Sequence, residues 1–214
     1  MLSCRSFLSQ KIYLHIVTAR NPPRLVLAST SAYRRELLSR FGIPFETVAP
    51  NCDEAPLPQE HPAATAERLA ETKATAVAER YPDALIIGSD QVAYSGLETY
   101  GKPGDRASAV RQLHSMSGRT VVFHTGVCLL NTRSGIAHRA GVATEVRFRS
   151  LSADEIRRYL DREPDALNCA GSAKSEGLGI SLLEALRGDD PTALIGLPLI
   201  ALAEMLRRED IDLP

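Results

Sequence analysis

Three small hydroxylated residues, Ser29, Thr30 and Ser31, are followed closely by two adjacent arginines, Arg34 and Arg35. If a strand ends before the serines and a helix begins after them, the backbone N–H groups of this connection lie at the positive end of the helix dipole, where they favour an anion. Each guanidinium group can bind a phosphate through two parallel hydrogen bonds, which a lysine cannot do. The stretch therefore predicts a phosphate site that contains Ser29, Ser31, Arg34 and Arg35. A purely structural alternative remains, in which one hydroxyl caps the helix and both arginines face water.

A carboxylate and an amide follow an apolar segment near the middle of the chain. The stretch ALIIGSDQVAY, residues 84–94, begins with apolar residues and a glycine and continues with Asp90 and Gln91. We expect the strand to end before Asp90, which would place the carboxylate where strand ends of α/β sheets meet ligands. A carboxylate there can bind a metal ion or take a proton from water. An Asx turn or a helix N-cap would explain the same aspartate without any site.

Two further loops carry charged side chains. The segment CAGSAKSEGLGI, residues 169–180, contains Lys174, Glu176 and several glycines, but it lacks the glycine spacing of a Walker A motif or a dinucleotide-binding loop. Lys102 lies in a turn that a glycine and a proline fix on either side. The structural alternatives are a flexible turn for the first loop and a solvated lysine for the second.

Both signs of charge occur in these segments, as the binding of a polyphosphate requires. Cationic side chains neutralise phosphate oxygens, and carboxylates hold the magnesium-like ion that bridges those oxygens and polarises the attacked phosphorus. The residues alone therefore favour phosphoryl-transfer chemistry. The candidate cations are Arg34, Arg35, Lys73, Lys102 and Lys174, and the candidate carboxylates are Asp53, Glu54, Asp90 and Glu176.

The composition of the 214-residue chain limits its partners. Its 25 basic and 26 acidic residues give a net charge of −1, so there is no overall attraction to a nucleic acid polymer or an anionic membrane. The four cysteines lie far apart without the spacing of zinc ligands. No apolar run reaches the roughly 20 residues that cross a bilayer. We expect a soluble protein of the reducing cytoplasm, in which any anion site is local.

The segments that must position these residues alternate between strand and helix patterns, which is typical of an α/β fold. Two consecutive strand patterns flank Ser134-Gly135 and indicate an antiparallel hairpin, so the sequence predicts a mixed sheet. We expect residues 24–214 to form one domain and residues 1–23 to form a flexible extension. The predicted strands are Arg24–Ala28, Phe45–Ala49, Ala84–Gly88, Thr120–Asn131 and Gly141–Arg149. The predicted helices are Ala32–Phe41, Ala63–Arg80, Asp105–Met116, Pro198–Arg208 and a helix through Leu160 that a capping box of Ser152 and Glu155 begins.

Seven short motifs, in order and at similar spacing, resemble the Maf family of nucleoside triphosphate pyrophosphatases. The resemblance extends from about Arg24 to Arg208. Within the family, Gln91 after the aspartate and the Lys-Ser-Glu-Gly form of the late loop are most similar to the branch that acts on 7-methyl-GTP. The motifs are LVLASTSAYRRELL, VAPNCDEAP, LAETKA, IIGSDQV, GKP, HTGV and CAGSAKSEGLGI.

The resemblance implies an activity, a fold and a set of site residues. The implied activity is cleavage of a nucleoside triphosphate between its α and β phosphates, with a divalent cation (Mg, Mn or Co) as cofactor. The implied fold is an α/β/α sandwich with an elongated mixed sheet and a deep cleft, similar to that of inosine triphosphatases, in a cytoplasmic protein that often forms a homodimer. The implied roles are Asp90 as catalytic base, Glu54 and Asp90 at the metal, Arg34, Lys73 and Lys102 at the phosphates, and Tyr33, Gln91 and Glu176 in the choice of base.

One motif departs from the branch pattern, because Ser-Ala-Tyr-Arg-Arg, residues 31–35, stands where Ser-Pro-Trp-Arg-Arg is usual. Methylation at N7 makes guanine cationic, and an aromatic face over such a ring contributes roughly 0.5 to 2 kcal/mol, so Tyr33 keeps the type of interaction. Glu176 can accept hydrogen bonds from the guanine N1–H and the exocyclic amine. Two alternatives stay open: a pyrophosphatase for UTP, CTP or other modified nucleotides, and a nucleotide-sensing regulator of cell division without a major catalytic role.

Overall fold

One mixed β-sheet organises residues 23–213, which are the residues that the computed structural model describes. Its strands are β1 (Arg24–Ala28), β2 (Phe45–Val48), β3 (Ala84–Ser95), β4 (Glu98–Tyr100), β5 (Thr120–Asn131), β6 (Ala137–Phe148) and β7 (Leu183–Arg187). They lie in the order β2-β1-β3-β5-β6-β7, and β4 pairs with β3. Strand β1 is parallel to β2 and β3, whereas the other neighbouring strands are antiparallel. The predicted mixed sheet is confirmed.

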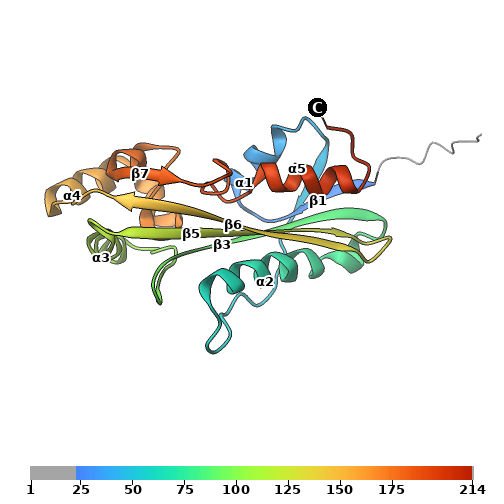
Figure 1. Cartoon of the computed structure of the whole chain (residues 1–214), viewed down its shortest axis with the longest axis horizontal. Coiled ribbons are helices and arrows are strands. Elements are labelled where there is room, and N and C mark those ends of the chain that lie inside the picture. Colours follow the sequence, from blue (N-terminus) through green and yellow to red (C-terminus); the bar gives the residue numbers. More distant parts are fainter. Residues whose placement is uncertain (1–22, 214) are drawn as a thin grey trace, which may run out of the picture.

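Helices cover both faces of this sheet and its far end. The helices are α1 (Ala32–Ser39), α2 (Pro62–Thr75), α3 (Arg106–Met116), α4 (Ala153–Arg162) and α5 (Leu199–Arg208). Figure 1 shows α2 along one face and α1 and α5 on the other, whereas α3 and α4 lie near the end of the sheet that is remote from β1. The predicted α/β class is confirmed.

The core follows from the two-residue period of the strands. Successive side chains of a strand point to opposite faces of its sheet. In β1, Leu25 and Leu27 belong to the apolar cluster that includes α1 and α5, and Val26 and Ala28 belong to the cluster that includes α2. A third cluster joins α3 and α4 to β5 and β6 at the far end. Because burial of one such aliphatic side chain contributes about 1.5 to 3 kcal/mol, β1 fixes the helices on both faces of the sheet.

Two glycines let α2 approach the sheet closely. A Cβ atom at Gly88 of β3 would lie 2.0 Å from the carbonyl oxygen of Ala70, and one at Gly126 of β5 would lie 2.5 Å from that of Ala66. Glycine is therefore required where the helix backbone passes over these strands. The close contact brings the side chains of α2 within reach of the polar residues of β3.

Several predicted bounds agree with the structure and others do not. Strands β1 and β5 occupy the predicted residues, and the hairpin between β5 and β6 and the capping box of α4 are both present. The predicted helix Ala63–Arg80 was too long, because α2 ends at Thr75 and a separate 3-10 turn follows at Ala78–Arg80. Strand β6 starts at Ala137 instead of Gly141. The short strands β4 and β7 were not predicted.

The prediction that a strand ends before Asp90 is wrong. Strand β3 continues to Ser95, and Asp90 lies inside it, paired with Gly126 of β5. Pairing between the two strands runs without interruption from Leu85 to Tyr94. Pairing with β5 over this whole stretch keeps the polar residues in the strand and overrides the low strand preference of aspartate.

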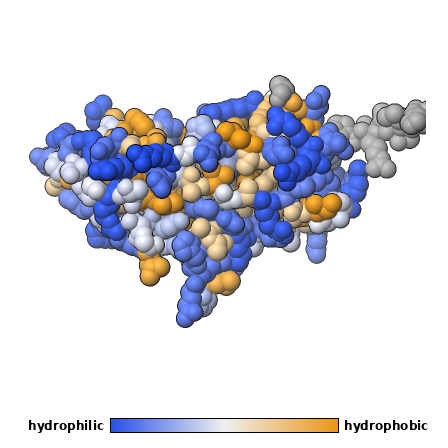
Figure 2. Space-filling model, viewed as in Figure 1, coloured by the Kyte–Doolittle hydropathy of each residue, from blue (hydrophilic) through white to orange (hydrophobic). Residues whose placement is uncertain are grey.

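The surface shows mixed character over the described residues. Hydrophilic side chains cover most of the face in Figure 2, with apolar ones scattered between them. Such scatter is ordinary on a folded surface. Among residues 23–213 no helix combines the length and apolar character needed to span a bilayer. The predicted flexible extension, residues 1–23, lies outside the described residues except for Pro23.

Candidate active site

A polar pocket of about 370 Å³ opens between the two ends of the sheet, and a second pocket of about 280 Å³ adjoins it at the N-terminus of α1. The two share several lining residues, so they form one continuous depression. Residues from α1, α2, β3, β5 and several loops contribute to its walls. The shared lining residues are Ser31, Tyr33, Arg34, Glu54, Lys73, Lys102 and Asn168.

The structure brings together almost all the site residues that the sequence predicted. Ser29 lines the second pocket. Three candidates line neither pocket: Asp53, Lys174 and Arg35, whose side chain is exposed. Successive helix residues point about 100° apart, and the rotation of α1 places Tyr33 and Arg34, but not Arg35, on the side of the pocket. The predicted site residues that line the first pocket are Ser31, Tyr33, Arg34, Glu54, Lys73, Asp90, Gln91, Lys102 and Glu176.

One ammonium group joins two carboxylates at the centre of the pocket. Lys73 Nζ lies 2.6 Å from Asp90 Oδ1 and 2.7 Å from Glu54 Oε2. The Lys73 side chain is 7% exposed and that of Asp90 12% exposed, whereas Glu54 is 53% exposed. Lys73 and Asp90 therefore form an ion pair largely shielded from water, and Glu54 meets it from the solvent side.

The elements that carry this ion pair are among the best fixed in the fold. Asp90 lies in strand β3, where it pairs with Gly126 of β5, and Lys73 lies in the last turn of α2, which Gly88 admits close to β3. A buried charge is stable only when it is paired and hydrogen-bonded. The sequence meets that need by placing the lysine on the one helix face that contacts β3.

The Arg34 side chain is anchored by the backbone of a distant loop. Its Nε donates a hydrogen bond to the carbonyl oxygen of Gly196 at 2.8 Å, and the Ser89 hydroxyl donates to the same oxygen at 2.9 Å. Gly196 has a φ of 119°, a backbone conformation that favours glycine. Burial lowers the pKa of the Arg34 guanidinium, while the carboxylates of Asp90 and Glu54 act in the opposite direction. The group remains a cation at neutral pH.

Ser29 and Ser31 shape the N-terminus of α1. Ser31 is the N-cap residue, and its hydroxyl accepts a hydrogen bond from the Arg34 N–H at 3.4 Å. The Ser29 hydroxyl accepts one from the Ser31 N–H at 3.1 Å. The capping role that the sequence left as an alternative is therefore present, and it coexists with a position on the pocket wall.

The amide of Gln91 is held in one orientation. Its Nε2 lies 2.9 Å from Thr125 Oγ1 and 3.0 Å from each of the carbonyl oxygens of Ala193 and Leu194. Because the amide nitrogen is committed to these acceptors, the amide oxygen is the group that Gln91 offers to the pocket as an acceptor.

Tyr33 lies beside the late loop. Lys174 Nζ is 5.8 Å from the centre of the Tyr33 ring, and burial raises the pKa of the Tyr33 hydroxyl. The expectation that Lys174 is a phosphate-facing cation is not met, because its ammonium bonds Glu163 and Asp165 and lines neither pocket. Glu176, two residues further on, is exposed and lines the first pocket.

Sequence reasoning missed part of the pocket wall. Asn168 and Cys169 line it, and burial raises the pKa of the Cys169 thiol to about 11, so the thiol is protonated at neutral pH. The loop of residues 193–196 supplies the carbonyl oxygens that orient Gln91 and Arg34. A backbone carbonyl oxygen is present in every residue, so the apolar sequence Ala-Leu-Ile-Gly of this loop did not indicate that it orients other side chains.

The carboxylates of Glu54 and Asp90 are the donors that a divalent cation could use. Among residues 23–213 no group of three or more His, Cys, Asp or Glu side chains is arranged to hold a metal ion. Mg²⁺ is ordinarily bound by one or two carboxylates together with substrate phosphate oxygens. Two carboxylate oxygens that both lie within 2.7 Å of one ammonium fit that donor set. The residues present therefore suit a cation that arrives with a phosphorylated ligand.

The fold and the pocket define a class of protein: an α/β protein with a site for a phosphorylated ligand, in which cations and paired carboxylates face each other. The particular family follows from sequence comparison. Residues 24–209 match the family described as Maf-like protein, and the chain belongs to the Maf family. The predicted family resemblance is confirmed.

Curated relatives cover nearly the whole chain. A 7-methyl-GTP pyrophosphatase of Aromatoleum aromaticum is 62% identical over 191 residues, which are 89% of this chain and 98% of that protein. A 7-methyl-GTP pyrophosphatase of Xanthomonas oryzae pv. oryzae is 58% identical over 192 residues, 90% of this chain and 100% of that protein. One of Thiobacillus denitrificans is 55% identical over 193 residues, 90% of this chain and 96% of that protein.

Proposed function

We propose that this protein is a nucleoside triphosphate pyrophosphatase that hydrolyses 7-methyl-GTP to 7-methyl-GMP and pyrophosphate. The observation that carries the proposal is the 62% identity to a 7-methyl-GTP pyrophosphatase across 98% of that protein. The pocket supports it independently, because it combines a cationic region for phosphates with an aromatic ring and a carboxylate for the base.

Asp90 is the residue that we assign as general base. Its Oδ1 is bonded by Lys73 at 2.6 Å, so we assign Oδ2 to accept the proton of the attacking water. As the water oxygen bonds to the α-phosphorus, the bond from that phosphorus to the bridging oxygen breaks, and pyrophosphate leaves. Lys73 keeps the carboxylate in place between strand and helix while the proton moves.

The triphosphate binds where the cations converge. Arg34, anchored through Nε at Gly196, can direct its remaining N–H groups to phosphate oxygens, and Lys102 adds a mobile point charge from its turn. When bound, a divalent cation (Mg, Mn or Co) between Glu54 and Asp90 would neutralise phosphate charge and polarise the attacked phosphorus. In-line attack then depends on how these side chains orient the chain of phosphates.

The base binds at the opposite end of the pocket. The ring of Tyr33 offers a π-face to the cationic 7-methylguanine, an interaction of roughly 0.5 to 2 kcal/mol. The Glu176 carboxylate can accept hydrogen bonds from the base N1–H and exocyclic amine, and Gln91 offers its amide oxygen as a further acceptor. Uracil and cytosine carry no charge and present a different edge, so this arrangement favours the methylated purine.

A nucleotide panel with identified products tests the proposal. Purified protein would be incubated with 7-methyl-GTP, GTP, UTP, CTP or dTTP in the presence of Mg²⁺, Mn²⁺ or Co²⁺. We expect 7-methyl-GTP to react fastest and to yield pyrophosphate and 7-methyl-GMP. Release of inorganic phosphate and 7-methyl-GDP would contradict the assigned bond. A preference for UTP or CTP would favour the pyrimidine alternative, and tight binding without turnover would favour the regulator. Cytoplasmic location, homodimerisation and a single domain over residues 24–214 stay predictions.

A further inference from the structure

The loop that carries Glu176 is built around a carboxylate that does not line the pocket. Glu163 follows the last residue of α4, and its side chain is 14% exposed. Its Oε1 accepts a hydrogen bond from Lys174 Nζ at 3.1 Å, and its Oε2 accepts one from the Leu178 N–H at 3.1 Å. Lys174 and Leu178 flank Glu176 by two residues on each side. One carboxylate thus holds both arms of the segment that presents Glu176.

The sequence of the loop leaves room for this carboxylate. A Cβ atom at Gly177 would lie 2.4 Å from Glu163 Oε2, closer than real Cβ contacts come. The carbonyl oxygen of Lys174 accepts hydrogen bonds from the N–H groups of Gly177 and Gly179, each at 3.0 Å. The turn around Glu176 is therefore closed by its own backbone and shaped to admit Glu163.

Glu163 also reaches the aromatic side of the base region. The ammonium that it holds lies 5.8 Å from the centre of the Tyr33 ring, in the range of a cation–π contact. The hydrogen bond that Lys174 donates to Glu163 is the largest cause of the raised pKa of Lys174, so this ammonium is charged at neutral pH. Through Lys174, Glu163 sets the spacing between Tyr33 on α1 and the loop that carries Glu176.

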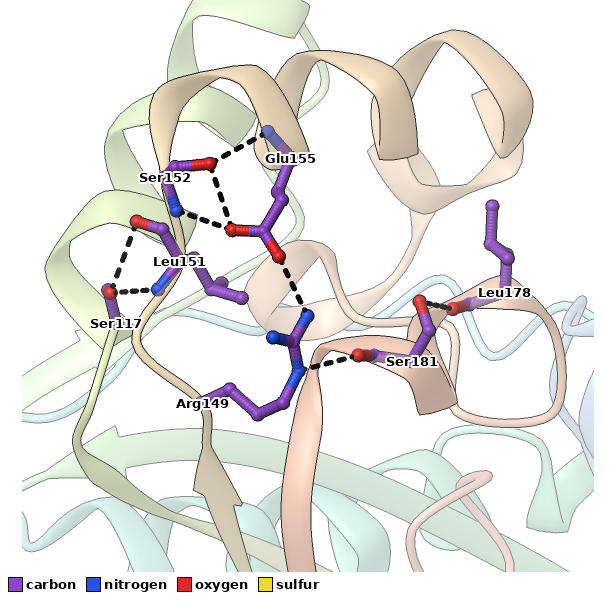
Figure 3. Close-up of polar contacts among 7 residues, drawn as sticks. All are labelled: Ser117, Arg149, Leu151, Ser152, Glu155, Leu178 and Ser181. Carbon is purple, nitrogen blue, oxygen red and sulfur yellow. Dashed lines mark hydrogen bonds and ion pairs between the residues drawn. The ribbon is translucent and has the colours of Figure 1, made fainter.

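The outer end of the loop is held separately, as Figure 3 shows. The Ser181 hydroxyl donates to the Leu178 carbonyl oxygen at 2.8 Å, and Arg149 Nε donates to the Ser181 carbonyl oxygen at 2.9 Å. The Arg149 guanidinium also bonds Glu155 in the first turn of α4. On the other side of the turn, the Lys174 ammonium also bonds Asp165 and the Lys174 N–H donates to the Tyr159 hydroxyl at 3.1 Å. Loss of the Glu163 contacts would therefore loosen the segment around Glu176, most of all on its Leu178 side, while the connection to β7 stays attached.

We propose that Glu163 is a positioning residue for base selection, which holds the Tyr33 ring and the Glu176 carboxylate at the spacing that a 7-methylguanine base occupies. The inference rests on the proposed function, because it concerns the base end of the same pocket. Glu163 acts through Lys174 and Leu178 and has no role at the phosphates. Its removal alters recognition of the base and leaves the chemical step intact.

The test is the ratio of kcat/KM for 7-methyl-GTP to kcat/KM for GTP in the Glu163→Gln variant. We expect this ratio to fall about tenfold through a higher KM for 7-methyl-GTP, because small displacements of positioning groups have effects of this size or larger. We expect kcat for GTP to stay within about twofold of wild type. The matched control is Asp161→Asn, which neutralises an exposed carboxylate of the same helix that pairs with Arg106.

A second variant approaches the same contact from the loop. Gly177→Ala leaves Glu163 in the sequence but places a methyl group 2.4 Å from its Oε2, too close for the carboxylate to stay in place. We expect the same fall in the substrate ratio. An unchanged ratio in both variants would overturn the inference, and so would an equal loss of kcat/KM for both nucleotides, since that indicates a structural role alone. A wild-type protein without preference for 7-methyl-GTP would instead refute the proposed function, so the two failures are distinguishable.

Discussion

The two ends of the pocket are built in different ways. At the phosphate end, Lys73 lies on α2 and Asp90 inside β3, two elements in close backbone contact. At the base end, Glu176 lies on a turn between two short 3-10 segments, Ala170–Ser172 and Leu178–Leu182, and the turn is held by a few polar contacts. Tyr33 belongs to the first turn of α1, beside that loop. Lys73 and Asp90 are thus fixed by the core, whereas the position of Glu176 depends on local hydrogen bonds.

This difference has a physical reason. A buried ion pair needs partners that do not move, because an unpaired charge in a poorly solvated place is strongly destabilising. Base recognition needs a flat aromatic face and an acceptor at the right spacing, which a loop can supply at the surface. We therefore expect substitutions at the phosphate end to abolish the reaction and substitutions at the base end to change which nucleotide reacts.

The largest effect is expected at Asp90. The Asp90→Asn variant keeps the shape of the side chain but removes the proton acceptor, so we expect hydrolysis of 7-methyl-GTP to fall by about 10²- to 10⁴-fold. Calorimetric titration with 7-methyl-GTP would show largely retained binding. The control is Asp53→Asn, a nearby carboxylate that lines neither pocket. Turnover of Asp90→Asn within tenfold of wild type would contradict its assignment as base.

The next largest effect is expected at Arg34. Each charge-assisted hydrogen bond lost in Arg34→Ala weakens triphosphate binding and turnover by roughly 1.5 to 3 kcal/mol. Arg34→Lys should not restore them, because one ammonium cannot hold the Gly196 carbonyl oxygen and a phosphate in the fixed geometry of a guanidinium. Steady-state kinetics with 7-methyl-GTP and with GTP would show equal losses for both nucleotides.

Arg35 provides the matched control for Arg34. It is the adjacent arginine of the same helix, but it is exposed and lines neither pocket. Substitutions of exposed residues ordinarily change the free energy of unfolding very little. Because Arg35 also lies outside the pocket, we expect Arg35→Ala to keep kcat/KM within about twofold of wild type. A loss in Arg35→Ala equal to that in Arg34→Ala would mean that general positive charge, not the anchored guanidinium, attracts the triphosphate.

Smaller effects on selectivity are expected at the base end. Tyr33→Trp offers a larger π-face, so we expect it to preserve or raise the preference for 7-methyl-GTP over GTP. Glu176→Gln removes a negative charge and introduces an amide donor, so UTP and CTP should gain relative to 7-methyl-GTP. Competition assays on purified variants would measure these ratios. If wild type, Tyr33→Trp and Glu176→Gln have the same ratios of kcat/KM between these nucleotides, base selection depends on other residues of the chain.

The smallest effect is expected at the end of the sheet remote from β1, where the capping box begins α4. The hydrogen bonds from Ser152 and the contact with Arg149 lower the pKa of Glu155 from 4.5 to about 2. Since the folded pKa lies below the unfolded one, this contribution to stability is complete above pH 4.5 and is lost as the pH falls towards 2. When the pH is lowered from 4.5 towards 2, we expect the melting temperature to fall less in Glu155→Gln than in wild type.

A double variant checks that prediction. Ser152→Ala alone should lower the free energy of unfolding by about 0.5 to 2 kcal/mol at neutral pH. Because Ser152 and Glu155 form one capping box, Ser152→Ala combined with Glu155→Gln should cost less than the two separate effects together. Additive effects measured by denaturant unfolding would show that the two side chains act independently.

The sequence alone predicted which residues lie at the phosphate end of the pocket, but not the tertiary contacts that hold them there. Local patterns were sufficient for β1, for the start of α1 and for the carboxylate in GSDQV, because each depends on neighbours in the chain. The length of β3 was not predictable in this way, since Asp90 stays in the strand through its pairing with β5. The same limit applied to Arg35, because only the rotation of α1 against the sheet decides which arginine enters the pocket.

The base end depended still more on contacts between distant segments. The motif KSEG indicated that Glu176 matters, but nothing in it showed that Lys174 turns away from the phosphates towards Glu163. The carbonyl oxygens that orient Gln91 come from residues about one hundred positions further along the chain. Such contacts arise from tertiary packing, which the order of residue types does not specify locally.

Competition between 7-methyl-GTP and GTP in a single reaction tests most directly whether catalysis and base selection are located at separate ends of the pocket. Both monophosphate products would be quantified for wild type, Arg34→Ala and Glu176→Gln. We expect a wild-type ratio above about tenfold in favour of 7-methyl-GTP, the same ratio at much lower turnover in Arg34→Ala, and a clearly smaller ratio in Glu176→Gln. A wild-type ratio near one, or an equal change of the ratio in both variants, would contradict this account.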